Sequence, residues 1–134
     1  MPKTHVNPNT LFPSLPHGFS QIVTAQGGKT VYLSGQTAWD AEKRIVGGRD
    51  LAAQARQALR NVQAAMEAVR GGIEDVVSLR IYMVNYMPAD AGAISGVLKE
   101  FFPSESAPAS TWIGVSSLAA ADFLIEIEAI AVVE

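Results

Sequence analysis

The sequence has no cysteine. This absence excludes disulfide bonds, thiolate metal sites and a cysteine nucleophile. Charged residues are also few, at 17% of the chain, and the ten lysine and arginine residues are scattered. With a net charge of −3 at pH 7, the chain lacks the basic stripe that follows the phosphates of a nucleic acid. We therefore expect no nucleic-acid partner.

Long apolar runs are missing as well. No stretch of about 18 apolar residues occurs, and the N-terminus MPKTHVNPNT has no apolar segment of signal-peptide length. We therefore expect a cytoplasmic protein without a membrane partner. Hydrophobic residues nevertheless make up 49% of the 134 residues, and the mean hydropathy is +0.18. This composition predicts one domain, 1–134, and a homo-oligomer that hides the surplus apolar surface.

Common catalytic signatures are also absent. The sequence contains no GxxxxGK[ST] phosphate loop, no GxGxxG and no GxSxG. His5 and His17 have no carboxylate at metal-ligand spacing. We therefore expect neither a metal site nor a cofactor.

What is present is an alternation of strand and helix patterns. Residues 1–18 contain Pro8, Pro13 and Pro16, which predict an irregular segment. The order β-β-α-β-α-β-β predicts an α+β fold with a mixed sheet and two helices on one face. We expect the alternate positions on the other face to carry apolar side chains that another subunit covers. Two segments flank Gly27-Gly28 as in a hairpin. The expected strands lie near 19–25, 30–36, 75–86, 109–115 and 124–132, and the expected helices near 51–70 and 89–101.

Two carboxylates interrupt the aliphatic C-terminal strand, LIEIEAIAVVE. Residues two apart on a strand share a face, with Cα atoms about 6.5–7 Å apart. Glu126 and Glu128 therefore point the same way, and like charges at this spacing require a cation or a chemical task. We expect Glu128 to pair with Arg80 on a neighbouring strand, and Glu126 to be the candidate general base.

Other polar groups could face a ligand. Ser34 and Gly35 end a strand, where a hydroxyl and backbone amides can bind a small molecule, although SGQ is equally a strand-ending turn. Ser110 and Thr111 lie on opposite faces of their strand. Trp112 shares the face of Ser110, where it either walls a pocket or is simply packed.

Four segments resemble the RidA/YjgF family, also called endoribonuclease L-PSP or reactive-intermediate deaminase-like. They are LSGQTA, AAQARQALRNVQAAMEA, SLRIYMV and IEIEAIAV, and the resemblance extends from about residue 18 to 133. It implies a chorismate-mutase-like α+β fold. It also implies a homotrimer whose sheets form a central barrel, with three small-molecule clefts between subunits.

The resemblance further implies roles for individual residues. In the deaminating members, an arginine binds the substrate carboxylate, and a glutamate on the last strand positions the water that hydrolyses an imine such as 2-aminoacrylate. The glutamate corresponds to Glu126, and the strand-ending serine to Ser34. The arginine of the family pattern P-A-R-[ST]-x-V does not correspond, because Ser110 stands in its place. Phe19 replaces an aromatic hydroxyl, and Trp112 adds bulk.

These residues support a hydrolase for an imine, enamine or other small metabolite without a carboxylate. Glu126 would be its general base, and the chain would be a poor 2-imino-acid deaminase because Ser110 replaces the arginine. The expected ligand-binding residues are Phe19, Ser34, Gly35, Ser110, Thr111 and Trp112. The alternative is a trimer that binds or senses a metabolite without turnover. An endoribonuclease or translation inhibitor is disfavoured by the acidic pI near 5.3 and the lack of a histidine cluster.

Overall fold

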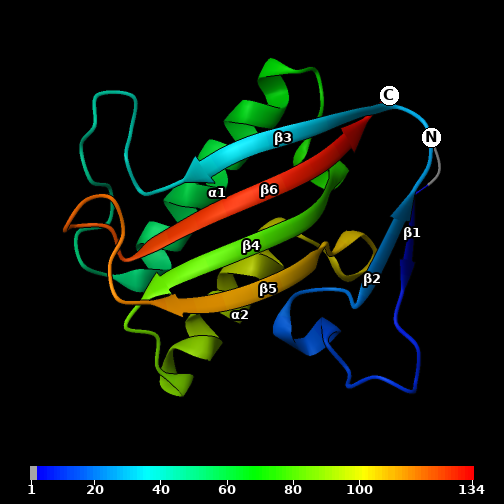
Figure 1. Cartoon of the computed structure of the whole chain (residues 1–134), viewed down its shortest axis with the longest axis horizontal. Helices are drawn as coiled ribbons and strands as arrows, with labels where there is room; N and C mark the ends of the chain where they lie inside the picture. Colours follow the sequence, from blue (N-terminus) through cyan, green and yellow to red (C-terminus); the bar gives the residue numbers. More distant parts are fainter. Residues whose placement is uncertain (1–2) are drawn as a thin grey trace.

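The computed structural model describes residues 3–134, built around a four-stranded mixed sheet (Figure 1). The strand order is β3-β6-β4-β5. β6 is antiparallel to both β3 and β4, whereas β4 and β5 are parallel. The predicted α+β class is confirmed. The strands are β3 (Lys29–Gln36), β4 (Val76–Val84), β5 (Ala109–Val115) and β6 (Ile125–Val133).

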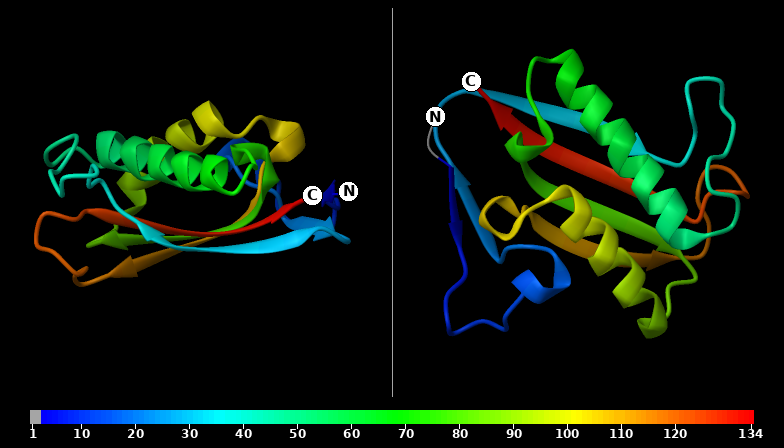
Figure 2. Two further views of the ribbon diagram at one scale, coloured as in Figure 1. Left: turned by 90° about the horizontal axis from the view of Figure 1, so that it is seen from above. Right: turned by 180° about the vertical axis from the view of Figure 1, so that it is seen from behind.

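Two helices, α1 (Leu51–Ala68) and α2 (Ala91–Phe101), cover one face of this sheet (Figure 2). Each helix has an apolar stripe at helical spacing, which packs on the aliphatic side chains of the strands. The prediction that both helices lie on the same face is confirmed. The helices contribute Ala55, Ala58, Leu59, Val62, Met66, Ile94, Val97 and Leu98 to the core, and the central strands contribute Leu79, Ile81, Met83, Ile125, Ile127 and Ala129.

Short 3₁₀ segments occur in the connections. They are η1 (Leu15–His17), η2 (Ile73–Asp75), η3 (Pro88–Asp90) and η4 (Ser104–Ser106). No helix among the described residues, 3₁₀ or α, combines the length and apolarity needed to cross a membrane.

Residues 3–25 form an N-terminal arm that corrects two predictions. Residues 3–18 are not wholly irregular, because β1 (Lys3–Val6) is a strand that ends before Pro8. β2 (Ile22–Ala25) pairs with β1 rather than with β3, so the predicted hairpin around Gly27-Gly28 is wrong. Both glycines have the positive φ of a turn, 69° and 70°, but the two strands that this turn connects, β2 and β3, do not pair with each other. Residues 1 and 2 lie outside the described part of the chain.

Contacts with the body hold the arm in this position. Lys3 Nζ lies 2.7 Å from Asp75 Oδ1, with side chains only 14% and 22% exposed. At the other end of the arm, the Ser20 N–H donates to the Pro108 carbonyl at 2.9 Å. These ties favour the pairing of β2 with β1 over a hairpin with β3.

The sheet face opposite the helices, which we call the open face, is uncovered in the described part of the chain (Figure 2). We expected apolar side chains there, and Ile130 fits, but the centre of the face is polar. Arg80 lies opposite Glu128 and Tyr82 opposite Glu126 in the β4–β6 register.

Candidate functional site

The two carboxylates of β6 lie side by side on the open face. Ile125, Ile127 and Ala129 are buried under the helices, so strand alternation turns the intervening Glu126 and Glu128 to the other side. The prediction that both acids point the same way is confirmed. Their cross-strand neighbours on β4 decide which of them is engaged.

Glu128 is engaged by two groups of β4. The Tyr82 hydroxyl donates to Glu128 Oε1 at 3.0 Å, and Arg80 Nη1 lies 4.0 Å from the same oxygen. The hydrogen bond to Glu128, followed by burial and the nearby negative charge, raises the pKa of Tyr82 above its usual value. The predicted Arg80–Glu128 pair is confirmed. Tyr82 was missed, although its place two residues after Arg80 puts it on the same face.

Glu126 borders a pocket of about 280 Å³ on the open face. No hydrogen bond or ion pair involving its carboxylate is present within residues 3–134, so it is available to a ligand. The lining includes both carboxylates and no lysine or arginine. It consists of Gly35, Tyr82, Leu118, Glu126 and Glu128.

Gly35 leaves the space that the Glu126 carboxylate occupies. A Cβ atom at residue 35 would overlap Glu126 Oε2 and lie 2.7 Å from its Cδ. The pairing passes from Leu33–Ala129 to Gln36–Ile127, so two residues of β3 face only Glu128. This is a β-bulge, which re-aims the strand next to Glu126. Any side chain at residue 35 would therefore displace the carboxylate.

A second group of predicted site residues lies on the helix-covered side of β5. Ser110 is opposite Leu79 and Trp112 is opposite Ile81, and both of these partners are core residues. Trp112 Nε1 donates to Ser110 Oγ at 3.0 Å. The Phe19 ring packs on Trp112 with centroids 5.9 Å apart. The predicted common face of Ser110 and Trp112 is thus present, and it faces the core.

The predicted ligand-binding residues therefore form two separate groups within one protomer. Ser34 lies at the bulge beside Gly35, and Thr111 is opposite Arg80 on the open face, the face of Glu126. Phe19, Ser110 and Trp112 lie across the sheet from them. Among the described residues, no three His, Cys, Asp or Glu side chains lie close enough together to hold a metal ion.

Comparison with known proteins identifies the family. The model of the family described as Endoribonuclease L-PSP matches residues 12–133. The chain belongs to this family. The predicted RidA/YjgF membership is therefore confirmed.

Relatives in this family include a protein named 2-iminobutanoate/2-iminopropanoate deaminase from Dermatophagoides farinae. It is 38% identical over 116 residues, which cover 87% of this chain and 86% of the relative. Among solved structures, the Rid family protein YyfB from Yersinia pestis, described as of unknown function, is 41% identical. Its TM-score is 0.94, over 99% of this chain and 100% of that one.

Another family structure shares the fold with a lower sequence identity and a lower TM-score. The Escherichia coli protein TdcF, solved with bound serine, is 30% identical with a TM-score of 0.68, over 83% of this chain and 85% of that one. The mixed sheet with two helices is thus the fold of the family.

Proposed function

We propose that the chain hydrolyses a small imine or enamine that lacks a carboxylate, with Glu126 as general base. The proposed sites are clefts between the subunits of a homotrimer. The observation that carries this proposal is the Glu126 pocket, which contains an unengaged carboxylate and no cation in its lining.

The charge of the pocket argues against 2-imino acids as good substrates. A substrate carboxylate would face Glu126 and Glu128 with no guanidinium in the pocket lining to bind it. In this proposal Ser110 stands where the deaminating relatives have their arginine. A charge-assisted hydrogen bond contributes about 1.5–3 kcal/mol, so its loss weakens binding by roughly tenfold to more than a hundredfold. A neutral imine or a cationic iminium avoids this repulsion.

The proposed reaction needs one base and one water molecule. Glu126 takes a proton from water as the water oxygen attacks the carbon of the C=N bond. Glu126 gives this proton to the nitrogen, which completes a carbinolamine. Glu126 then moves the hydroxyl proton of the carbinolamine to the nitrogen as the C=O bond forms and the C–N bond breaks, and an aldehyde or ketone and ammonia leave. An iminium substrate gains stabilisation beside two carboxylates, and Tyr82 keeps Glu128 hydrogen-bonded throughout.

The second group of predicted site residues can contact a ligand beside Glu126 only if two protomers come together at the Glu126 pocket. Phe19, Ser110 and Trp112 cannot reach Glu126 of their own protomer through the sheet. We therefore propose that, in the trimer, this group borders the cleft that contains Glu126 of the adjacent subunit. Trp112 would then favour a flat or apolar ligand.

The test is aldehyde and ammonia release from an imine made in the assay by an amine oxidase acting on a primary amine. Glu126→Gln should abolish the rate enhancement. Glu128→Gln is the comparison variant, two residues away on the same strand but already bound by Tyr82. It removes one of the two pocket carboxylates and leaves the base in place, so we expect KM for a cationic imine to rise while most of kcat is retained. In parallel, 2-imino acids generated by an amino-acid oxidase should be hydrolysed slowly. Ser110→Arg tests whether an arginine at residue 110 raises the rate of 2-imino-acid hydrolysis.

Two outcomes would contradict this proposal. A clear wild-type rate on 2-imino acids, lost in Glu126→Gln, means that the arginine is dispensable. Ligand-dependent thermal stabilisation without turnover in any variant means that the chain is a binding or sensing module.

A further inference from the structure

Two side-chain amides of α1, Gln54 and Asn61, hold the backbone of the two chain segments that meet at the Glu126 pocket. They are seven residues apart, about two helical turns, and so lie on the same side of the helix. Gln54 is completely buried, at 0% exposure, which is unusual for a glutamine. Neither residue touches the pocket.

Gln54 connects α1 to the segment that leads into β6. Its Nε2 donates to the Asp122 carbonyl at 2.9 Å and to the Gly48 carbonyl at 2.7 Å, and its Oε1 accepts from the Leu124 N–H at 2.9 Å. The Leu124 carbonyl accepts from the Val84 N–H at 3.0 Å. Both backbone groups of Leu124, two residues before Glu126, are therefore fixed.

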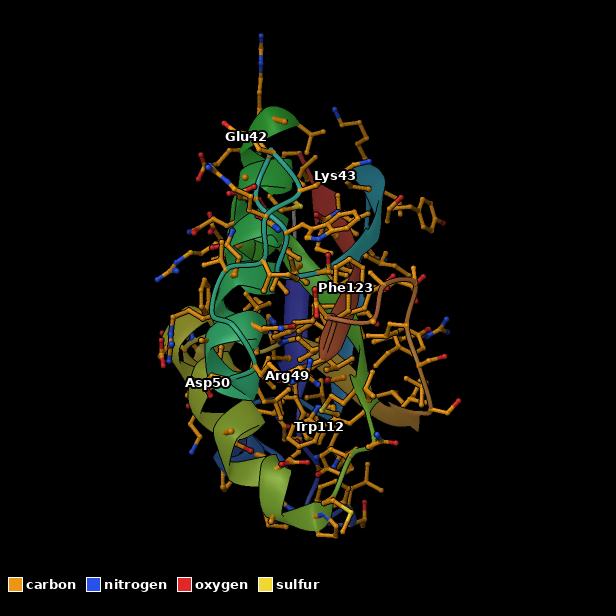
Figure 3. All side chains as sticks on the ribbon, turned by 90° about the vertical axis from the view of Figure 1, so that its left-hand side faces the viewer. Glu42, Lys43, Arg49, Asp50, Trp112 and Phe123 are labelled. Carbon is orange, nitrogen blue, oxygen red and sulfur yellow. The ribbon has the colours of Figure 1, made fainter. Side chains whose placement is uncertain are left out.

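The same loop also forms one wall of the pocket. Leu118, in the connection between β5 and β6, lines the pocket beside Glu126. Phe123, two residues before the start of β6, packs edge-on against Trp39 with centroids 4.7 Å apart. Figure 3 shows Phe123 on the same side of the molecule as Arg49 and Asp50, which lie at the start of α1.

Asn61 makes the corresponding connection on the other segment, where the chain leaves β3. Its Nδ2 donates to the Thr37 carbonyl at 2.9 Å and to the Trp39 carbonyl at 2.8 Å. Thr37 follows Gly35 by two residues. Asn61 therefore fixes the exit from the bulge, as Gln54 fixes the entry into β6.

We propose that Gln54 and Asn61 are positioning residues that set the close approach of Gly35 to the Glu126 carboxylate. The bulge leaves two residues of β3 opposite one residue of β6, so the ladder alone does not fix their register. The approach is too close to admit even a Cβ atom. The two amides supply the fixed points on either side. This inference rests on the proposed function only for the role of Glu126 as the base.

The test compares Gln54→Leu and Asn61→Leu with Arg56→Leu. Arg56 lies on the same helix and donates two hydrogen bonds to Glu100, at 2.8 and 2.9 Å, away from the pocket, so it is the matched control. Hydrolysis of the imine made from a primary amine by an amine oxidase is measured well below each melting temperature. We expect kcat to fall at least tenfold in Gln54→Leu and Asn61→Leu with KM within about twofold, and no such change in Arg56→Leu.

An NMR experiment on the same variants separates failure of this inference from failure of the proposed function. The Gly35 amide and the Glu126 side-chain carboxyl resonances should shift in Gln54→Leu and Asn61→Leu and remain unchanged in Arg56→Leu. Unchanged resonances, or kcat within twofold of wild type in both folded variants, would overturn the positioning role. If the wild-type protein lacks hydrolase activity, the proposed function fails while the resonances still decide the inference. Asn61→Leu decides alone if Gln54→Leu does not fold.

Discussion

The two faces of the four-stranded sheet are built from the same strands but have opposite properties. On β4, Leu79, Ile81 and Met83 face the helices and are at most 1% exposed. The intervening Arg80 and Tyr82 face outward, and the Arg80 side chain is 62% exposed. On β6 the same alternation separates Ile127 from Glu126 and Glu128.

Because of this alternation, two adjacent residues of one strand lie on opposite faces and have separate roles, one in stability and the other in chemistry. We expect burial against α1 and α2 to provide most of the folding free energy, and the polar groups of the open face to contribute little to it. Substitutions one residue apart should therefore separate stability from chemistry. The predictions below follow the comparison from the covered face to the open face.

The largest effect should come from the covered face. Ile127 is 1% exposed in the centre of the core. Ile127→Ala should lower the free energy of unfolding by about 2–5 kcal/mol, because burial energy is lost and a cavity remains. Urea denaturation measures this value. Glu126→Gln, one residue away, should change stability by less than about 0.5 kcal/mol. Similar losses for the two variants would contradict the separation of the faces.

Most of the fold could be predicted from the sequence because its periodicities are strong. The strand at 109–115 was placed at its observed bounds, and both helices were found from apolar stripes. The pairing of β2 could not be found this way. Gly27-Gly28 favours a hairpin locally, whereas the Lys3–Asp75 pair, 72 residues apart, holds β1 where β2 can pair with it. Strand pairing that depends on contacts between distant residues leaves no pattern in the local sequence.

The two carboxylates of the candidate site could be predicted from the sequence, but the side of the sheet on which the other site residues lie could not. The two-residue spacing placed Glu126 and Glu128 on one face, and Arg80 was correctly assigned to Glu128. The sequence could not show that Ser110 faces the core side, because which alternate set of β5 is inward depends on its pairing with β4. Gln54 was also missed, since a single glutamine in a helix gives no signal of burial.

An intermediate effect is expected for Tyr82→Phe on the open face. The substitution removes the hydrogen bond to Glu128 and should cost about 1 kcal/mol or less, because the pair is partly solvated. The pKa of Tyr82 is raised in the folded protein, so its contribution is fully present below the ordinary tyrosine pKa of about 10 and is lost as the pH rises through the folded value.

The measurement for Tyr82→Phe is the urea midpoint of both proteins at neutral pH and above pH about 10. The difference between wild type and variant should shrink on the alkaline side and be constant from neutral pH to mildly alkaline pH. A difference that grows with pH would mean that Tyr82 is not the donor to Glu128.

The smallest effect on stability should come from Arg80. Arg80 Nη1 and Glu128 Oε1 are 4.0 Å apart and well solvated, so Arg80→Met should cost less than about 0.5 kcal/mol.

The consequence of Arg80→Met should instead be electrostatic. The open face becomes one charge more negative, so KM for a cationic imine should fall at low ionic strength and return to the wild-type value at about 1 M salt, where the Debye length is about 3 Å. Arg80→Lys keeps the charge and is the control. If Arg80→Met instead destabilises the protein by several kcal/mol, the open face contributes to folding as the covered face does, and the two faces are not independent.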